Sequence, residues 1–252
     1  MEILGIDVGG SGIKGYPVDT DSGEALGDRI RIPTPSPATP DAIADAIVEI
    51  AKHFSWSGPV GCALPARVKN GIVKTATNIN KAFIGYDFAA ELEKRLGSIV
   101  ATVNDADAAG IAEMRFGAGR GRSGVVLLLT IGTGIGSALF IDGALVPNTE
   151  FGHINVEGHN GELYASDRTR EKKDLSWKKW SKRFQHYLDR IEFLLGPDLI
   201  IIGGGVSKPE RKEEWFKYLR TEADLVTAQT ANRAGIIGAA CNARDKAAAL
   251  SI

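Results

Sequence analysis

The sequence predicts an α/β protein built as two related α/β lobes around a cleft. Residues 3–18 and 127–141 share one pattern, in which a buried strand, a glycine-rich turn and a second strand follow each other. After each of these units, segments with apolar residues at helical spacing alternate with further short strands. With 252 residues, 44% of them hydrophobic, the chain is long enough for one large domain or two small lobes.

The first part of the chain is expected to hold a hairpin, two helices and two more strands. The hairpin follows from strand-like runs at residues 2–8 and 13–18, and a helix from Asp41 follows from the spacing of Ile43, Ile47 and Ile50. The other expected elements are a proline-rich loop over 31–40, a strand over 60–64, a tight turn at Asn70-Gly71, a helix over 86–96 and a strand over 98–103.

The second part repeats the organisation of the first. Its expected elements are a helix over 106–116, a glycine- and arginine-rich loop over 117–124, strands over 125–131 and 135–141, a polar stretch up to Asp174, a long helix from Trp177, a strand over 199–202 and a helix over 234–249. We expect a small N-terminal lobe of residues 1–103 plus 235–252 and a large C-terminal lobe of residues 104–234.

Composition excludes several classes of protein. The net charge of −1 gives no global attraction to nucleic acid or to an anionic membrane, and the longest apolar run, residues 125–131, is too short to span a bilayer. No secretory leader precedes the first strand. Cys62 and Cys241 alone make neither a disulfide framework nor a cysteine-rich zinc site. We therefore expect a cytoplasmic protein that binds neither nucleic acid nor membrane.

Three glycine-rich turns follow buried strands. Glycine lets the backbone approach a ligand closely, and successive N–H groups can then surround an anion. One such loop is as readily a tight turn of the chain, but three of them indicate phosphate binding. The predicted phosphate- or nucleotide-binding residues are Asp7, Gly9, Gly10, Ser11, Gly12, Lys14, Thr130, Gly132, Thr133, Gly134, Gly204, Gly205, Ser207 and Lys208.

Two stretches fit the dinucleotide-binding formula G-x-G-x-x-G without its structural context. The formula requires a preceding strand and a following helix. Residues 10–15 lead into a second strand, and residues 119–124 precede a strand, so we treat both matches as accidental. The Walker-type formula G-x-x-x-x-G-K-[ST] is absent from the sequence.

Asp105 ends a predicted strand and precedes a predicted helix, where ligand-binding groups gather in α/β sheets. Phosphoryl transfer to an alcohol needs a base beside the attacking hydroxyl, but Asp is also a common N-cap. The sequence pattern does not decide whether Asp105 is a general base or a helix cap. For Asp107 the pattern favours a structural role. Glu150, His153 and Glu162 form a second polar cluster suited to sugar hydroxyls, with a structural histidine as the alternative for His153.

The chain resembles the ROK sugar-kinase family, within the actin-like ATPase superfamily, over nearly its whole length. The resemblance rests on four motifs, at residues 7–15, 104–109, 132–136 and 150–153. It implies the actin-like ATPase (ribonuclease H-like) fold, Mg²⁺ bound with the phosphates, and a homodimer.

The same resemblance implies roles for individual residues. Asp105 corresponds to the family's general base, which deprotonates the sugar 6-hydroxyl. Asn104, Glu150 and His153 then correspond to sugar-binding residues, together with Asp105 itself.

The family's cysteine-rich zinc motif is missing here, although residues 161–166 match its end. This implies a sugar-binding role for Glu162 and no structural zinc. The zinc-free pattern is similar to the family's bacterial polyphosphate glucokinases, including polyphosphate/ATP glucomannokinase. Further matching segments are residues 146–150, 174–177 and 203–208. Residues 77–80 resemble that group's sugar-side loop, which adds Asn78 as a sugar ligand, while Asn80 stands where an aspartate is expected.

A polyphosphate chain would require a basic track. Candidates are Arg120 and Arg122 in the glycine loop and Lys178 and Lys182, which share one helix face. A solvated helix face is the alternative for the lysines.

The leading hypothesis is a glucokinase that uses polyphosphate, ATP or both. A broader hexokinase, accepting mannose or an amino sugar or using ATP only, is the alternative within enzymes. A non-catalytic sugar sensor is the alternative outside them, although no helix-turn-helix precedes the first strand.

Overall fold

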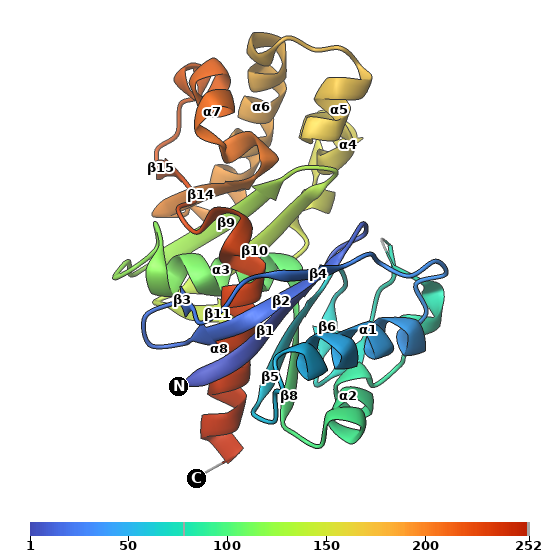
Figure 1. Cartoon of the computed structure of the whole chain (residues 1–252). Coiled ribbons are helices and arrows are strands. Elements are labelled where there is room, and N and C mark those ends of the chain that lie inside the picture. The colour runs from blue at the N-terminus through green and yellow to red at the C-terminus, as the bar shows by residue number, and fades with distance from the viewer. Residues whose placement is uncertain (78, 251–252) are drawn as a thin grey trace. The chain divides into compact units, whose positions relative to one another are not determined.

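Figure 1 shows the computed structural model of the chain, which describes residues 1–77 and 79–250. The chain divides into two compact units, Met1–Ala112 with Arg233–Ile252 (unit 1) and Glu113–Asn232 (unit 2). Each unit is built on one main sheet, and each sheet begins with an antiparallel hairpin and continues with parallel strands. The predicted α/β class and the predicted repeat of the hairpin unit are therefore confirmed.

The sheet of unit 1 places three parallel strand ends at one edge. Its strands, in spatial order, are β3 (Glu24–Ala25), β2 (Ile13–Asp19), β1 (Glu2–Val8), β5 (Val60–Leu64) and β8 (Val100–Asn104), and β4 (Ile30–Ile32) also pairs with β2. Because β1, β5 and β8 run parallel, their carboxyl ends lie together. Asp7 pairs with Ala63 and Leu64 pairs with Asn104, so the first glycine turn and Asn104 lie two strand spacings apart, about 10 Å.

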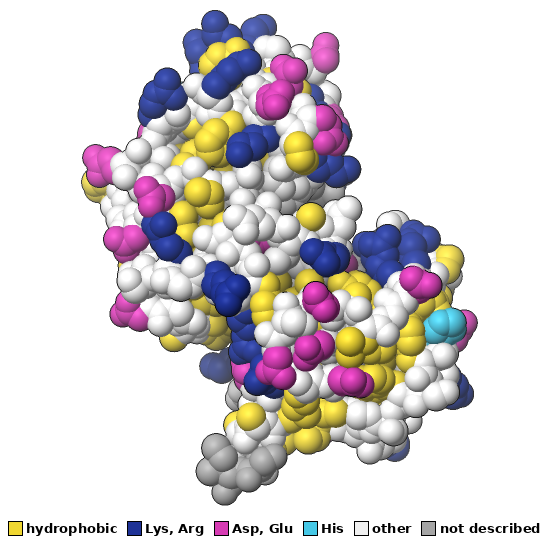
Figure 2. Space-filling model, turned by 60° about the vertical axis from the view of Figure 1, so that its left-hand side comes forward, with side chains coloured by type: hydrophobic (Ala, Val, Ile, Leu, Met, Phe, Trp, Pro, Cys, Tyr) yellow, Lys and Arg dark blue, Asp and Glu magenta, His cyan; other side chains and the backbone are white. Residues whose placement is uncertain are grey.

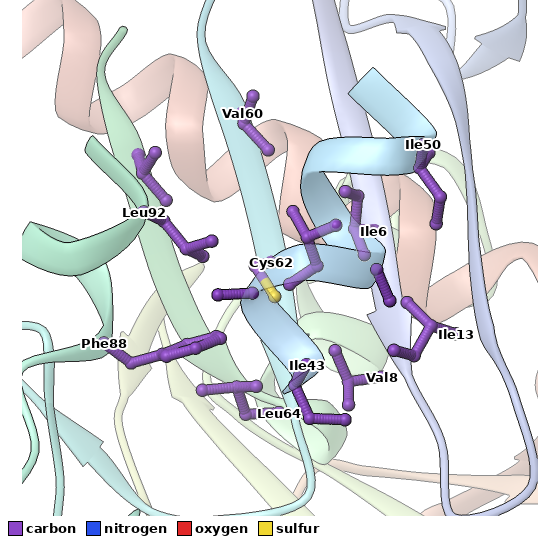
Figure 3. Packing of buried hydrophobic residues seen from close by; sticks show 14 of the residues in the cluster. Ile6, Val8, Ile13, Ile43, Ile50, Val60, Cys62, Leu64, Phe88 and Leu92 are labelled. Atoms are coloured by element: carbon purple, nitrogen blue, oxygen red, sulfur yellow. The ribbon is translucent and has the colours of Figure 1, made fainter. Parts of the chain in front are cut away.

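Helices cover both faces of this sheet. One face carries α1 (Pro40–His53) and α2 (Phe88–Leu96), whose Ile43, Ile50 and Phe88 pack around Cys62 (Figure 3). The other face carries α8 (Ala234–Leu250). Gly61 precedes Cys62 in β5 and therefore faces the opposite side of the sheet, where a side chain on Gly61 would overlap the Ala239 carbonyl of α8. Burial, with the charge of Asp7, raises the pKa of the Cys62 thiol, which indicates an unreactive core residue.

The sheet of unit 2 has the same arrangement of strand ends. Its order is β11 (Ala144–Val146), β10 (Ile135–Ile141), β9 (Val125–Ile131), β14 (Leu199–Gly204) and β15 (Asp224–Thr227), with the last three parallel. Gly204 pairs with Ile131, so the second and third glycine turns lie side by side at one edge.

Aromatic side chains fill the core of unit 2. Trp180, Phe184 and Tyr187 of α6 (Trp177–Leu195) are fully buried and stack on one another. Trp215 of α7 (Pro209–Trp215) packs edge-on against Trp180 and Phe184. Ser176 caps the start of α6 by accepting the N–H of Lys179, and Gly196 ends it at a φ of 52°. The predicted long helix from Trp177 is confirmed.

Several predicted boundaries differ from the structure. The helix expected from Tyr86 begins at Phe88 because Asp87 accepts the Ala90 N–H as its cap, and the helix expected from Asp41 begins at Pro40. The loop predicted over 31–40 is wrong for Arg31 and Ile32, which pair with β2 as part of β4. Edge pairing overrode the polar, proline-rich composition there.

The strand predicted over 98–103 runs from Val100 to Asn104, and the helix predicted from Ala106, α3 (Asp105–Phe116), begins at Asp105. The polar stretch before Asp174 holds β12 (Asn155–Val156), β13 (His159–Asn160), α4 (Gly161–Ala165) and α5 (Asp167–Lys172). The smaller elements are β6 (Val68–Lys69), β7 (Ile72–Val73), and short 3₁₀ turns at 81–83, 151–153, 205–207, 216–218 and 231–233. Among the described helices, none is long and apolar enough to cross a membrane.

Candidate active site

Asp7 is the acidic residue of the predicted first phosphate site, and it lies near the carboxyl end of β1. Its carboxylate Oδ2 is 3.7 Å from the Lys14 Nζ, and Gly235 leaves room beside it, since a side chain there would come within 3.2 Å of the Asp7 Cγ. Burial raises the pKa of Asp7, with Lys14 and then Arg29 acting in the opposite direction. Lys14 is thus a cation beside this carboxylate, and Gly235 leaves the adjoining space open.

The first glycine turn is held by side chains that the sequence did not reveal. Arg31 donates from Nη2 to the Ser11 carbonyl at 2.5 Å, and Thr34 donates from Oγ1 to the Gly9 carbonyl at 2.6 Å. The Gly9 N–H donates to the Gly12 carbonyl at 3.1 Å. Gly10 and Ser11, in contrast, are exposed, and their N–H groups have no acceptor in the described part of the chain. This turn therefore presents backbone donors on a fixed frame, as an anion-binding nest requires.

The second turn has the same property. Thr133 is exposed, and within the described residues the N–H groups of Thr133 and Gly134 have no acceptor. The turn is held by the Gly132 N–H, which donates to the Gly134 carbonyl at 3.0 Å, and by the Arg168 N–H, which donates to the Gly132 carbonyl at 3.1 Å.

Glycine at positions 10 and 132 is not required by the surrounding protein. A side chain at either would meet no described atom within 4 Å, and neither has a positive φ. At Gly204, by contrast, φ is 80° and ψ is −166°, and a side chain would overlap the Ile131 carbonyl. Gly204 is thus required by the fold, whereas Gly10 and Gly132 leave space that a ligand could use.

The third turn continues from Gly204 into a 3₁₀ turn over Gly205–Ser207. The Ser207 hydroxyl donates to the Gly204 carbonyl at 2.9 Å, and Lys208 is exposed. The hydroxyl of Ser207 thus stabilises the turn itself.

Asn104 caps helix α3. The Asn104 Oδ1 accepts the N–H groups of Ala106 at 2.9 Å and Asp107 at 3.1 Å, while its Nδ2 donates to the Ala66 carbonyl at 3.2 Å. Asp105 is exposed, and its Oδ1 accepts the Ala106 N–H at 2.9 Å. Asp107 is 1% exposed, in line with the structural role preferred for it. Asn104 thus supplies a cap for α3, and Asp105 lies exposed at the strand edge.

Glu150, His153 and Glu162 come together in unit 2. His153 lies 3.9 Å from each glutamate, by its Nε2 to the Glu150 Oε2 and by its Nδ1 to the Glu162 Oε1. Ser137, which is buried, holds the segment before His153 by donating to the Thr149 carbonyl and accepting the Phe151 N–H. The polar cluster predicted from the sequence is therefore a real cluster in space.

Asn160 sets the tautomer of His153. Its Oδ1 accepts the N–H groups of Glu162 and Leu163, which fixes the orientation of the amide. Its Nδ2 therefore donates to the His153 Nδ1 at 3.1 Å, so in the neutral ring the proton is on Nε2. His153 thereby presents an N–H donor on the side of Glu150 and its Nδ1 on the side of Glu162, so a donor lies close to two glutamate acceptors, a combination suited to vicinal hydroxyls.

Close packing at Gly152 and Gly161 fixes the two segments that carry His153 and Glu162. A side chain at Gly152 would overlap the Ile135 carbonyl, and one at Gly161 would approach the Tyr187 ring to 2.9 Å. Tyr187 donates to the Phe151 carbonyl at 3.0 Å, and burial, followed by the charge of Glu162, raises its pKa. Glu162 also reaches the second turn, where its Oε2 accepts the Ile135 N–H at 3.4 Å.

The predicted basic track has mixed support. Arg122 pairs with Asp224, whereas Arg120, Lys178 and Lys182 are exposed with no acidic partner in the described part of the chain. On the face drawn in Figure 2, Lys and Arg side chains alternate with Asp and Glu. Asn78 lies outside the described residues, and Asn80 caps a short 3₁₀ turn by accepting the Ala82 N–H.

Comparison with known proteins identifies the family. Residues 3–174 match the model described as the ROK family. The chain belongs to the ROK family. It is 48% identical over 238 residues to a polyphosphate glucokinase of Mycobacterium tuberculosis (strain CDC 1551 / Oshkosh), a match that covers 94% of this chain and 89% of that protein. The resemblance inferred from the sequence motifs is confirmed.

Solved structures agree with this assignment. The inorganic polyphosphate/ATP-glucomannokinase from Arthrobacter sp. strain KM matches with a TM-score of 0.90 and 44% identity, over 97% of this chain and 99% of that one. A ROK family glucokinase from Streptomyces griseus, in complex with glucose and AMPPNP, matches with a TM-score of 0.80 and 26% identity, over 97% and 100%. The actin-like ATPase fold expected for the chain is confirmed.

Proposed function

We propose that this ROK-family protein is a glucokinase that transfers a phosphoryl group from inorganic polyphosphate, ATP or both to the 6-hydroxyl of glucose. The observation that carries the proposal is Asp105, exposed at the edge of the parallel strands beside the helix cap Asn104, in a chain 48% identical to a polyphosphate glucokinase. Glucose supplied with each donor in turn, and assayed for glucose 6-phosphate, tests it.

Each group of residues has one task in the reaction. Asp105 takes the proton of the 6-hydroxyl as its oxygen attacks the terminal phosphorus, and the bond from that phosphorus to the rest of the donor breaks. Glu150, His153 and Glu162 hold the other hydroxyls, and Asn104 contributes the remaining N–H of its amide. The glycine turns hold the donor phosphates by their free backbone N–H groups.

Magnesium fits this donor set. Within the described residues no three metal-binding side chains gather, so the ion would be held mainly by donor phosphates, with Asp7 as the protein carboxylate. When bound, it neutralises charge on the phosphates.

Replacing Asp7 by asparagine is expected to separate stability from activity. Burial raises the pKa of Asp7 above 3.8, so the folded state favours the protonated form and loses stability as the pH rises from about 3.8 through the raised pKa. At pH 7, D7N should therefore melt at the wild-type temperature or above it, while its KM for the donor rises. Thermal melts and donor titrations check this, and a lower melting temperature with normal donor kinetics would contradict it.

Replacing His153 by alanine is expected to raise the KM for glucose about ten-fold or more, because one hydrogen bond to a hydroxyl is lost and two glutamates lose their shared neighbour. The KM for the donor should stay within about two-fold. His186→Ala is the matched control, since His186 is exposed and bonds to Tyr164 rather than to either glutamate. Equal glucose kinetics for the two variants would remove His153 from the sugar site.

A broader hexokinase is the second candidate, because the Arthrobacter relative is described as a glucomannokinase. Comparing kcat/KM for glucose, mannose and amino sugars distinguishes the two.

The resemblance also leads us to propose a homodimer. Both cysteines are buried as thiols, which favours the cytoplasm as its location.

A further inference from the structure

Helix α5 joins the second and third glycine turns of unit 2. At its start, the Arg168 N–H donates to the Gly132 carbonyl of the second turn. Asp167, next to it, accepts from the Nη1 of Arg211 at 2.8 Å, and that Nη1 lies 3.8 Å from where a side chain on Gly205 would begin. Arg168 thus bonds directly to the second turn, and Asp167 holds Arg211 next to the third turn.

The arginines around Asp167 differ in the number of interactions that their guanidinium groups make. Arg170 donates from Nε to Asp167 and from Nη2 to Glu171, and its guanidinium lies 4.1 Å from the centre of the Trp177 ring. Asp167, with a side chain only 9% exposed, is thereby shared by Arg170 and Arg211. Its charge is neutralised by these two and does not compete for Arg168.

Arg168 is left without an acidic partner. Its side chain is exposed, and across residues 1–77 and 79–250 it makes no ion pair, side-chain hydrogen bond or cation–π contact. With Arg170, Arg211 and the exposed Lys208, it gives this region four cations against three carboxylates, Asp167, Glu171 and the Glu162 that reaches the second turn. The backbone of Arg168 lies against the second turn, where the N–H groups of Thr133 and Gly134 have no acceptor among the described residues.

We infer that Arg168 is a ligand of the donor phosphate chain, with Arg211 as the second cation of the same site, held by Asp167. A guanidinium carries five N–H donors in a planar fork that matches phosphate oxygens, and it stays charged at every working pH. The inference rests on the proposed function for the identity of the donor, but the site itself is one for an inorganic phosphate chain.

The test compares Arg168→Ala with Arg168→Lys and with Arg190→Ala. Arg190 is a matched control because it is an exposed arginine of unit 2 whose guanidinium lies 5.5 Å from the Phe193 ring centre, on α6. Long-chain polyphosphate and ATP are titrated at saturating glucose and several salt concentrations, and inorganic tripolyphosphate binding is measured by calorimetry without glucose. Thermal melts establish that every variant is folded.

Arg168→Ala is expected to raise the KM for polyphosphate and the Kd for tripolyphosphate about ten-fold or more, and to weaken their salt dependence. Arg168→Lys should recover part of the loss, and Arg190→Ala should change both constants less than about two-fold. The KM for glucose should not move. Equal constants in Arg168→Ala and Arg190→Ala would overturn the inference, as would wild-type protein that binds no tripolyphosphate.

The outcomes keep this inference separate from the proposed function. Wild-type protein that phosphorylates glucose from neither donor refutes the glucokinase proposal, while the tripolyphosphate Kd still decides the role of Arg168. Normal phosphorylation with an unchanged tripolyphosphate Kd in Arg168→Ala refutes the role of Arg168 alone.

Discussion

Replacing Asp105 by asparagine is expected to lower kcat for glucose phosphorylation by about 10² to 10⁴, the usual contribution of a positioned general base. Asparagine keeps the shape of the side chain but cannot take the proton of the 6-hydroxyl. Because Asp105 is exposed and Asn104 supplies the helix cap, the variant should fold normally and still bind glucose. Coupled assays for turnover and calorimetry for glucose binding measure the two properties separately.

Asn104→Ala is the control that distinguishes a base from a cap. It removes the acceptor of two N–H groups at the start of α3 and should cost about 1 kcal/mol of folding free energy. If D105N lost stability to the same extent and kept its turnover, Asp105 would be a second cap and some other group would be the base.

Replacing Gly204 by alanine is expected to destabilise unit 2 severely. A φ of 80° with a ψ of −166° is open essentially to glycine alone, and the new Cβ would overlap the backbone of Ile131 on the neighbouring strand. Backbone strain and overpacking each cost about 1–3 kcal/mol, which together are a large share of the stability of a typical domain. Soluble yield and denaturant unfolding are the measurements.

Gly132→Ala is the counterpart, because the fold does not require glycine at that position. With no described atom within 4 Å of the new Cβ, stability should change by less than about 0.5 kcal/mol. The KM for the donor should rise several-fold, since the methyl group occupies space offered to phosphate. Unchanged donor kinetics in a folded G132A would mean that the second turn binds no phosphate.

The strand ends could be predicted from the sequence because a glycine-rich turn directly after an apolar run is typical of the place where a buried strand stops. Asp105 could be predicted as a candidate in the same way, since its place between a strand and a helix is visible in the pattern. Its separation from the capping role could not be predicted, because Asn and Asp are both good caps. Only the hydrogen bonds of Asn104 distinguish the two.

The residues that support the site were missed for a physical reason. Arg31 and Thr34 reach the first turn only because β4 pairs with β2, and no local pattern encodes that edge pairing. Ser137 acts on a segment that follows it by more than ten residues, which spacing rules do not capture. Asn160 could have been predicted from the sequence, since an asparagine before Gly161-Glu162 is a typical helix cap.

The most direct test of the proposed function is glucose phosphorylation measured side by side with long-chain polyphosphate and with ATP, in the presence of Mg²⁺. The proposal predicts glucose 6-phosphate from polyphosphate in the complete absence of ATP, and loss of the product in D105N. Binding of glucose without transfer from either donor would contradict it and indicate a sugar sensor instead.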